Sequence, residues 1–350
     1  MLVLREEDII SILHGLTREE CKRLTQVLWN GMREYSSSVK SPEAKLIHQP
    51  IRESIVTNQN HTTLFMPASD TQTTTGVKIV TLPRNGGPPK GAINIFAPEG
   101  NLDGVLNAEE VTAFRTALAS MIPFSLYKLP INAEILVFGA GKQAEWHIRL
   151  LLLLAEPSIA RITFISRQQE SIDKFYKDVV EGLREQYPRV AFHGHVYDDI
   201  VGIDVDKMRR NEVVRSDVIC GCTPSTIPLF HNSHLGEGKK RFISLIGSYK
   251  PHMQEIDSAT LLSATRILVD SKNACLAEAG ELIQAGVKRD QLVEIGEIPA
   301  GATNDDLTSI VGPGNVIFKC VGMGIMDLVI GRELLNMALE RGLGIEISEF

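Results

Sequence analysis

Short apolar runs alternate with helical or loop segments from Ile131 onward. The runs are AEILVFGAG (133–141), RITFISR (161–167), VAFHGHV (190–196), SDVICGCTP (216–224), RFISLIG (241–247) and RILVDS (266–271). This alternation is typical of a mostly parallel sheet with helices on both faces. We therefore expect an α/β fold with a Rossmann-type doubly wound sheet in this part of the chain.

The first hundred residues show a different pattern, which predicts an open sheet. HTTLFMPAS (61–69), TGVKIVTLP (75–83) and GAINIFAPEGNLDGVLN (91–107) are strand-like and are separated by Gly, Pro and Asn. A helix is predicted next, because Asn107 and Glu110 resemble a capping box at its start, and Pro123 marks its approximate end. The last segment, 321–343, is again helical, and we expect it to return to the N-terminal strands in a smaller α+β domain.

The length of the chain favours two domains. Its 350 residues are more than one hydrophobic core usually serves. The change of pattern places one domain at 1–122 together with 321–350 and the other at 123–320.

Charge and composition exclude several kinds of partner. The net charge of −7 argues against a nucleic-acid surface, and the apolar run Leu150–Ala155 is too short to span a membrane. The N-terminus has no signal-peptide pattern, and five cysteines without a CxxC pair argue against a zinc site or a disulfide framework. Cys220 and Cys222 are interpreted as buried small hydrophobes, and His193 and His195 as surface histidines. We expect no metal and a cytoplasmic location.

A glycine-rich turn follows the first strand of the parallel sheet. It comprises Gly139, Ala140, Gly141, Lys142, Gln143 and Ala144, a GxGxxA pattern. The first glycine allows the tight turn, the second lets the backbone approach a pyrophosphate, and the alanine allows close helix–strand packing. Because the pattern follows a strand, opens a helix and precedes a second strand, it indicates a dinucleotide site at the helix N-terminus.

The end of the second strand favours one dinucleotide. An acidic residue there would accept hydrogen bonds from the ribose 2′-OH of NAD, but this chain has Ser166 and Arg167. Arginine pairs with a 2′-phosphate, so NADPH is predicted as the cofactor in preference to NADH. The alternative is that Arg167 is only a solvated loop residue.

Two cationic residues lie on apolar elements, and a third follows a proline. Lys78 has apolar neighbours on both faces of its strand, and Arg115 lies on an apolar helix face. Arg52 follows Pro50 and Ile51 and could project from a strand start. Either each pairs with a local carboxylate, or together they form an anion site, because unpaired buried charge is costly. With a dinucleotide fold in the same chain, the shared anion site is the better interpretation. Arginine binds carboxylates in a bidentate manner, and a desolvated lysine acts as an acid or base.

Motifs along nearly the whole chain resemble the ornithine cyclodeaminase/mu-crystallin family. They are PIR (50–52), LFMPA (64–68), TGVKIVT (75–81), TAFRTALAS (112–120), GAGKQAE (139–145), TPS (223–225), IGSYKPHMQEID (246–257), VDSKNACLAEAGELI (269–283) and FKCVGMGIMD (318–327). The resemblance implies a homodimer in which 1–122 with 321–350 binds the substrate and forms the dimer, while 123–320 binds the dinucleotide.

The same resemblance implies roles for individual residues. By position, Arg52, Lys78 and Arg115 match residues that hold the substrate carboxylate, and Arg115 also matches a cofactor contact. Val321 matches a residue beside the substrate and nicotinamide. Thr223 matches a cofactor-contacting threonine, and Ser225, in the same TPS motif, is expected to join it.

One departure from the family separates its branches. Ornithine cyclodeaminases carry an aspartate two residues before the proline of the IGSYKP segment, where this chain has Tyr249, and a later lysine, where it has Met253. Cys320 also replaces a frequent serine. The first hypothesis is therefore an NADPH-dependent reductase of a C=N bond beside a carboxylate, with Lys78 as the catalytic residue, or the reverse oxidation of an amino acid.

Two alternatives stay open from the sequence. One is an NAD-dependent ornithine cyclodeaminase, which forms proline and ammonia. The other is a protein of mu-crystallin type that binds NADPH and a small acid without turnover.

Overall fold

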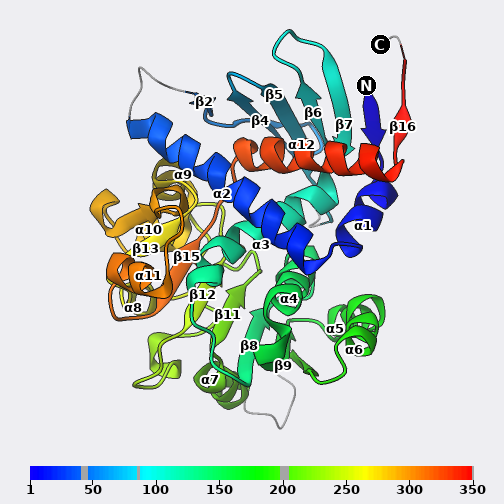
Figure 1. The fold of residues 1–350 in the computed structure, drawn as a ribbon. Coiled ribbons are helices and arrows are strands. Elements are labelled where there is room, and N and C mark those ends of the chain that lie inside the picture. The colour runs from blue at the N-terminus through cyan, green and yellow to red at the C-terminus, as the bar shows by residue number, and fades with distance from the viewer. Residues whose placement is uncertain (41–45, 85–86, 198–204, 349–350) are drawn as a thin grey trace. The chain divides into compact units, whose positions relative to one another are not determined.

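The computed structural model describes residues 1–40, 46–84, 87–197 and 205–348 (Figure 1). The chain divides into two compact units. The first comprises Met1–Leu118 and Gly322–Phe350, and the second comprises Ala119–Val321. The assignment of substrate binding and dimerisation to the first and of dinucleotide binding to the second stays a prediction.

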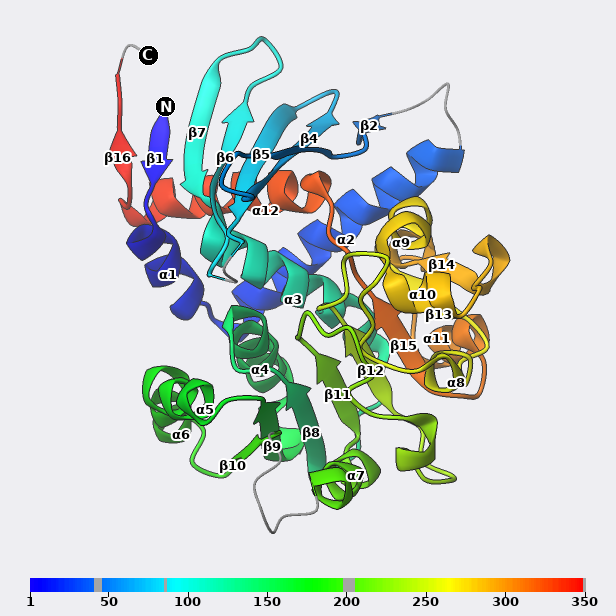
Figure 2. The same ribbon diagram turned by 180° about the vertical axis from the view of Figure 1, so that it is seen from behind.

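The first unit is a mostly antiparallel sheet with helices. Its strands are β1 (Leu2–Leu4), β2 (Ile47–His48), β3 (Glu53–Val56), β4 (Thr62–Asp70), β5 (Thr74–Leu82), β6 (Lys90–Phe96), β7 (Leu102–Asn107) and β16 (Ile345–Glu346). They follow the order β16-β1-β7-β6-β5-β4-β2, with β3 also paired to β4, and only β1 and β7 are parallel (Figure 2). The helices are α1 (Glu6–His14), α2 (Arg18–Lys40), α12 (Gly324–Arg341) and the first part of α3 (Ala108–Leu126). The open sheet and the returning C-terminal helix are confirmed.

Helix α12 lies on one face of this sheet because small strand residues permit close contact. A Cβ at Gly76 of β5 would lie 2.7 Å from Leu328 of α12, and one at Gly104 of β7 would lie 2.6 Å from Leu335. The residues of β4, β5 and β6 that face the helix are buried. The side chain of Lys78, two residues along β5 from Gly76, therefore points to the helix-covered face.

The opposite face of the sheet carries apolar side chains that this chain leaves half-buried. They include Phe65, Val77, Ile79, Phe96 and Val105. Cross-strand pairing places Phe65 directly opposite Ile79, so these positions share one face.

The second unit is a parallel sheet. Its strands are β8 (Ala133–Phe138), β9 (Ile159–Ser166), β10 (Ala191–Val196), β11 (Val218–Gly221), β12 (Phe242–Leu245), β13 (Ile267–Val269), β14 (Leu292–Glu294) and β15 (Val316–Lys319). The order is β10-β9-β8-β11-β12-β15-β13-β14, and every pair is parallel. The helices are α4 (Lys142–Ala155), α5 (Gln169–Phe175), α6 (Glu181–Gln186), α7 (Val205–Arg215), α8 (Ser258–Leu261), α9 (Lys272–Glu278), α10 (Gly280–Gln284) and α11 (Asn304–Val311). The predicted doubly wound α/β sheet is confirmed; the short strands β14 and β15 were not expected.

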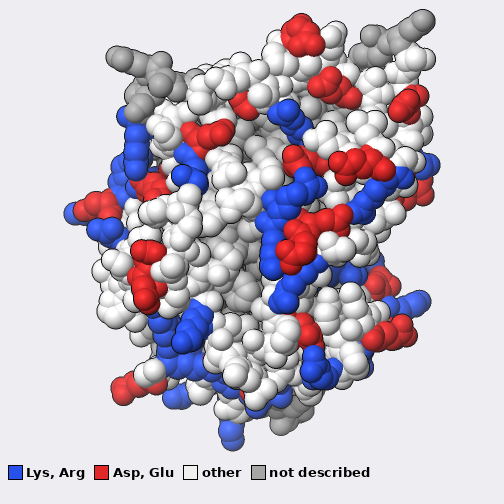
Figure 3. Space-filling view, viewed as in Figure 1, with Lys and Arg blue, Asp and Glu red and all other residues white. Residues whose placement is uncertain are grey.

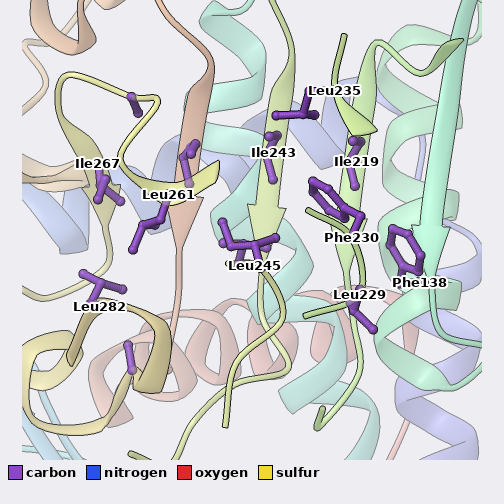
Figure 4. Packing of buried hydrophobic residues seen from close by; sticks show 14 of the residues in the cluster. Phe138, Ile219, Leu229, Phe230, Leu235, Ile243, Leu245, Leu261, Ile267 and Leu282 are labelled. Atoms are coloured by element: carbon purple, nitrogen blue, oxygen red, sulfur yellow. The ribbon is translucent and has the colours of Figure 1, made fainter. Parts of the chain in front are cut away.

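Side chains on both faces of the parallel sheet are buried, as crossover helices require. On one face, Leu136, Ile219 and Ile243 occupy paired positions and belong to a core that includes Leu261 of α8 and Leu282 of α10 (Figure 4). The other face packs against different helices. There Phe124 of α3 lies 5.5 Å from Phe242 of β12, between ring centroids, and Phe164 of β9 lies 4.9 Å from Phe175 of α5.

The predicted limits of helix α3 need one correction. Asn107 precedes the helix and its Oδ1 accepts a hydrogen bond from the backbone N–H of Glu109 at 2.9 Å. Pro123, however, lies inside the helix, which ends at Leu126. A proline costs about 3 kcal/mol in a helix interior. The burial of Ile122 and Phe124 on either side offsets this cost.

The surface carries charges of both signs. In Figure 3, basic and acidic side chains lie next to one another over much of the face shown. Ion pairs on α2 and α12 contribute to this, with Arg23 2.7 Å from Glu333 and Arg341 2.6 Å from Glu20. Within the described residues, no helix has the length and apolar character needed to cross a membrane.

Candidate functional site

Lys78, Arg115 and Asp327 form a buried cluster of charges in the first unit. The Nζ of Lys78 lies 2.7 Å from Oδ2 of Asp327, and the Nε of Arg115 donates to Oδ1 of the same carboxylate at 3.0 Å. The side chains are 1%, 4% and 1% exposed. Two cations therefore share one carboxylate in a site of low dielectric, which leaves one positive charge in excess within this trio.

Three elements bring these groups together, because β5 carries Lys78, α3 carries Arg115 and α12 carries Asp327. Lys78 lies on β5 between Met66 of β4 and Ile93 of β6, both buried, and its Nζ also lies 3.4 Å from Oγ1 of Thr112. Asp327 lies in the first turn of α12, where the positive end of the helix dipole stabilises a carboxylate.

A glycine makes room for the guanidinium of Arg115. Gly322 has φ +86°, and a Cβ there would lie 2.7 Å from Nη1 of Arg115. Any other residue would meet both strain and a clash at this position. The backbone before α12 therefore passes directly beside the cationic group.

The segment that carries Arg52 is tied to the start of α12. The side-chain Oε1 of Gln49 accepts a hydrogen bond from the backbone N–H of Ile325 at 2.8 Å, and its Nε2 donates to the carbonyl of Pro67 at 3.2 Å. Arg52 is half-buried, lies one residue before β3, and is near enough to lower the pKa of Lys78. The structure thus brings all three predicted cations into one region of the first unit.

The pKa of Lys78 is lowered to about 8. Burial is the largest cause, Asp327 opposes it, and the positive charges of Arg115 and Arg52 lower the pKa further. Desolvation therefore contributes most to the lowered pKa, and like-charge repulsion from the two arginines adds to it. A lysine with a pKa near neutrality exchanges a proton readily.

The glycine turn of the second unit lies at the switch point of the parallel sheet. β8 ends at this turn, with β9 on one side and β11 on the other, and ligands of α/β sheets bind outside the strand ends at such a point. Gly139 has φ +129°, which favours glycine, and a Cβ there would lie 3.1 Å from the carbonyl oxygen of Cys222. A Cβ at Gly141, the N-cap of α4, would meet nothing within 4 Å. Open space before a helix N-terminus fits a pyrophosphate.

A buried histidine fixes the helix behind this turn. The Nδ1 of His147 donates to the carbonyl of Gln143 at 2.7 Å, and its Nε2 accepts from the hydroxyl of Ser120 at 3.0 Å. Burial lowers the pKa of His147 to about 4, so the imidazole is neutral and one nitrogen is free to accept. Lys142, on the first turn, lies 3.5 Å from Glu145, and Ala144 is buried.

Arg167 lies beside the TPS segment. Its Nη2 donates to Oγ of Ser225 at 3.3 Å, and Ser225 is fully buried with its own hydroxyl donating to the carbonyl of Ile227 at 2.6 Å. This contact joins the end of β9, where Ser166 lies, to the loop after β11. Arg167 is exposed, and this hydrogen bond directs its side chain to the loop of Ser225. Its contact with the ribose stays a prediction.

Other predicted positions lie in the same unit. The backbone N–H of Val321 donates to the buried carboxylate of Asp270 at 3.2 Å. Tyr249 is half-buried in the loop after β12, with Lys250 over its ring at 5.7 Å, and Met253 is buried. Tyr249 and Met253 thus stand at the two positions where the sequence departs from the cyclodeaminase pattern, and the consequence for the reaction stays a prediction.

The cysteine and histidine interpretations are partly corrected. Cys220 is buried as expected, whereas Cys222 is only half-buried. His193 and His195 are half-buried in β10 rather than fully on the surface, and the Nε2 of His195 lies 3.9 Å from Glu212. Among the residues that the structure describes, no group of three His, Cys, Asp or Glu side chains is arranged to hold a metal.

Sequence reasoning missed the residue at the centre of the charge cluster. Asp327 ends the FKCVGMGIMD motif, but no role was assigned to it. The signal was present, because Arg115 required an anionic partner and Asp327 is an acid in an otherwise apolar helix start. What was missing was the packing that places α12 against β5.

The all-parallel sheet with a glycine turn at its switch point defines the second unit as a Rossmann-type α/β fold. More specifically, the chain belongs to the ornithine cyclodeaminase/mu-crystallin family, whose model matches residues 16–341. The family predicted from the sequence motifs is thereby confirmed.

Relatives of known name cover most of the chain. The Δ1-pyrroline-2-carboxylate reductase of Bacillus cereus is 29% identical over 339 residues, which are 91% of this chain and 95% of that protein. The ketimine reductase mu-crystallin of Mus musculus is 27% identical over 241 residues, 69% of this chain and 67% of its own. The solved structure of Thermococcus litoralis Δ1-pyrroline-2-carboxylate reductase in complex with NADH and L-proline has a TM-score of 0.78 and 20% identity, with 99% and 100% coverage.

Proposed function

We propose that this protein is an NADPH-dependent oxidoreductase that reduces the C=N bond of a cyclic imino acid with an adjacent carboxylate. The observation that carries the proposal is the buried trio of Lys78, Arg115 and Asp327, in which two cations share one carboxylate. The excess positive charge suits a substrate carboxylate. The reductase names of the relatives in Bacillus cereus and Mus musculus support the same reaction class.

The residues of the first unit have distinct tasks in this proposal. Arg115 and Arg52 hold the substrate carboxylate, and charge-assisted hydrogen bonds fix the orientation of the imine. Lys78, with a pKa of about 8, keeps a proton available for the substrate nitrogen. Asp327 holds both cations in place.

The second unit fits a dinucleotide. Gly141 leaves open space before α4, Gly139 adopts the positive φ of the tight turn, and the hydroxyl of Thr223 is buried without a hydrogen-bond partner in the described part of the chain. Gly139 to Ala144 would hold the pyrophosphate, and Ser166, Arg167 and Ser225 would hold the ribose 2′-phosphate. The bound nicotinamide supplies hydride to the substrate carbon.

The test is a substrate panel with the purified full chain. Oxidation of NADPH or NADH is followed with Δ1-pyrroline-2-carboxylate, Δ1-piperideine-2-carboxylate and acyclic imino acids, while ornithine with NAD is assayed for proline and ammonia. We expect turnover of cyclic ketimines. Proline formation from ornithine, despite Tyr249, would replace the proposal by a cyclodeaminase. NADPH binding without turnover of any substrate would replace it by a binding protein.

Arg167 is expected to set the preference for NADPH. Its guanidinium, held by Ser225, pairs with a 2′-phosphate that NADH lacks. Arg167→Ala should therefore weaken NADPH binding by about 1–3 kcal/mol and change NADH binding little. Arg189→Ala, a highly exposed arginine of the same unit, serves as the control. Equal affinities of the native protein for both cofactors, unchanged in the variant, would refute this role.

The half-buried apolar face of the first unit is proposed to form a homodimer. Its members, including Val77 and Ile79, lie opposite the face covered by α12, and apolar surface of this kind gains from a second copy. Val77→Arg should shift sedimentation at micromolar concentration from dimer to monomer. Leu339→Arg, at an exposed apolar position of α12, should leave the dimer intact. A native protein that sediments as a monomer would contradict the proposal.

A further inference from the structure

A buried carboxylate, Glu255, joins the loops that follow β11 and β12 in the second unit. Its Oε1 accepts a hydrogen bond from the backbone N–H of Thr223 at 2.9 Å, and its Oε2 accepts one from the backbone N–H of Gly247 at 2.7 Å. The residue is 0% exposed. Both loops leave the carboxyl edge of the parallel sheet, which is the edge where ligands of such sheets bind.

The two loops are in direct contact around this carboxylate. A Cβ at Gly247 would lie 1.9 Å from the carbonyl oxygen of Thr223, and one at Gly221 would lie 2.7 Å from Oε1 of Glu255. Because glycine has no side chain, the two backbones can close over the carboxylate. Glu255 therefore sets the spacing of the two loops by accepting one hydrogen bond from each.

Thr223 is the residue that this arrangement holds in place. Its Oγ1 is buried and has no hydrogen-bond partner among the described residues, while its carbonyl accepts from the N–H of Ser225 at 2.8 Å. Leaving a buried hydroxyl without a partner costs free energy, so an atom of a bound molecule is the natural partner. The same loop carries Ser225, which contacts Arg167.

The surroundings of Glu255 keep its charge sensitive to pH. Burial raises its pKa to about 7; Lys319 at the end of β15 lowers it, Glu281 of α10 raises it, and the two backbone amides lower it. Lys319 itself lies 3.1 Å from Glu281, with both side chains fully buried. Burial raises the pKa of the Cys220 and Cys222 thiols, and the negative charge of Glu255 raises both further, so these thiols stay protonated.

We propose that Glu255 is a positioning residue for the cofactor: its ionised carboxylate holds the loop of Thr223 and Ser225 in the conformation that contacts the bound dinucleotide. This inference rests on the proposed function, because it requires a dinucleotide at the glycine turn. The ionised carboxylate accepts from both amides. In the protonated form the oxygen that carries the proton is a weaker acceptor, so one of the two hydrogen bonds weakens and the loop is held less firmly.

Cofactor affinity is therefore expected to depend on pH with a defined sign. Above a pH of about 7 Glu255 is ionised and the loop is held, whereas below it the protonated form grows and binding weakens. The measurement is the dissociation constant of NADPH and of NADH, by calorimetry, from about pH 6 to about pH 8.5 around that pKa. NADH is the cleaner probe, because the 2′-phosphate of NADPH itself titrates with a pKa of about 6.

Glu255→Gln is the decisive variant. Its amide oxygen still accepts one hydrogen bond, but its NH₂ group faces the second N–H, so we expect affinity at high pH to fall about tenfold and the pH dependence to flatten. Glu255→Asp should keep a pH dependence. Glu212→Gln is the control: this buried carboxylate of the same unit pairs with Arg161 at 3.1 Å, so its loss should lower stability and leave the pH profile of binding unchanged.

The outcomes separate this inference from the proposed function. Failure of the native protein to bind either dinucleotide would remove both. Normal binding by the native protein, with the same affinity and pH profile in Glu255→Gln, would overturn the role of Glu255 alone. Where Glu255→Gln does not fold, the native profile with NADH decides, and an affinity that does not fall below about pH 7 overturns the inference.

Discussion

Replacing Asp327 by alanine is expected to lower the free energy of unfolding by about 3–5 kcal/mol. The reason is that Lys78 and Arg115, which are almost fully buried, would then face each other without a counter-charge. Removing one partner of a buried ion pair costs far more than removing an exposed one. Chemical denaturation followed by far-UV circular dichroism measures the effect.

Two further variants show whether the loss comes from the charges. Asp103→Ala removes an exposed carboxylate from β7 of the same unit and should change stability by less than about 0.5 kcal/mol. In the double variant Lys78→Met with Asp327→Leu, one cation leaves together with the anion, so the combined loss should be smaller than the sum of the two single losses. Strict additivity, or a single-variant loss no greater than that of Asp103→Ala, would show that the pairing does not stabilise the unit.

Lys78→Met is expected to lower kcat for a cyclic ketimine by about 10²–10⁴-fold, the usual contribution of general acid catalysis. NADPH binding should be nearly unchanged, because the glycine turn and Arg167 belong to the second unit. The buried methionine replaces a similar volume, and Asp327 keeps its partner Arg115, so the fold should tolerate the change. Lys90→Met, at an exposed position on β6, should retain full turnover.

The pH dependence of the native enzyme gives a second readout for Lys78. Because its pKa is lowered to about 8, the free enzyme loses the Lys78 proton as the pH rises through that value. The kcat/KM for reduction should therefore fall above a pH of about 8, and this limb should be absent from Lys78→Met. Full turnover by Lys78→Met, or an unchanged alkaline limb, would remove the proposed proton donor.

Local sequence was sufficient to predict features whose residues follow one another closely in the chain. The turn from Gly139 to Ala144 could be predicted because the strand, the turn and the helix that define it follow one another within a few residues. The parallel sheet was predictable for the same reason, since each of its apolar runs carries its own pattern. The burial of Lys78 followed from its immediate neighbours on β5.

Only the tertiary structure decided which groups meet. Asp327 is 212 residues from Arg115 in sequence, and it reaches the two cations because α12 packs on β5 through Gly76. Glu255 likewise reaches Thr223 and Gly247 through the close approach of two loops. The physical reason is that a buried charge requires a partner, but the residues next to it in the chain do not specify which residue that partner is. The sequence by itself therefore determined the family, the α/β fold and the cationic character of the candidate site, and the packing determined the carboxylates that hold it together.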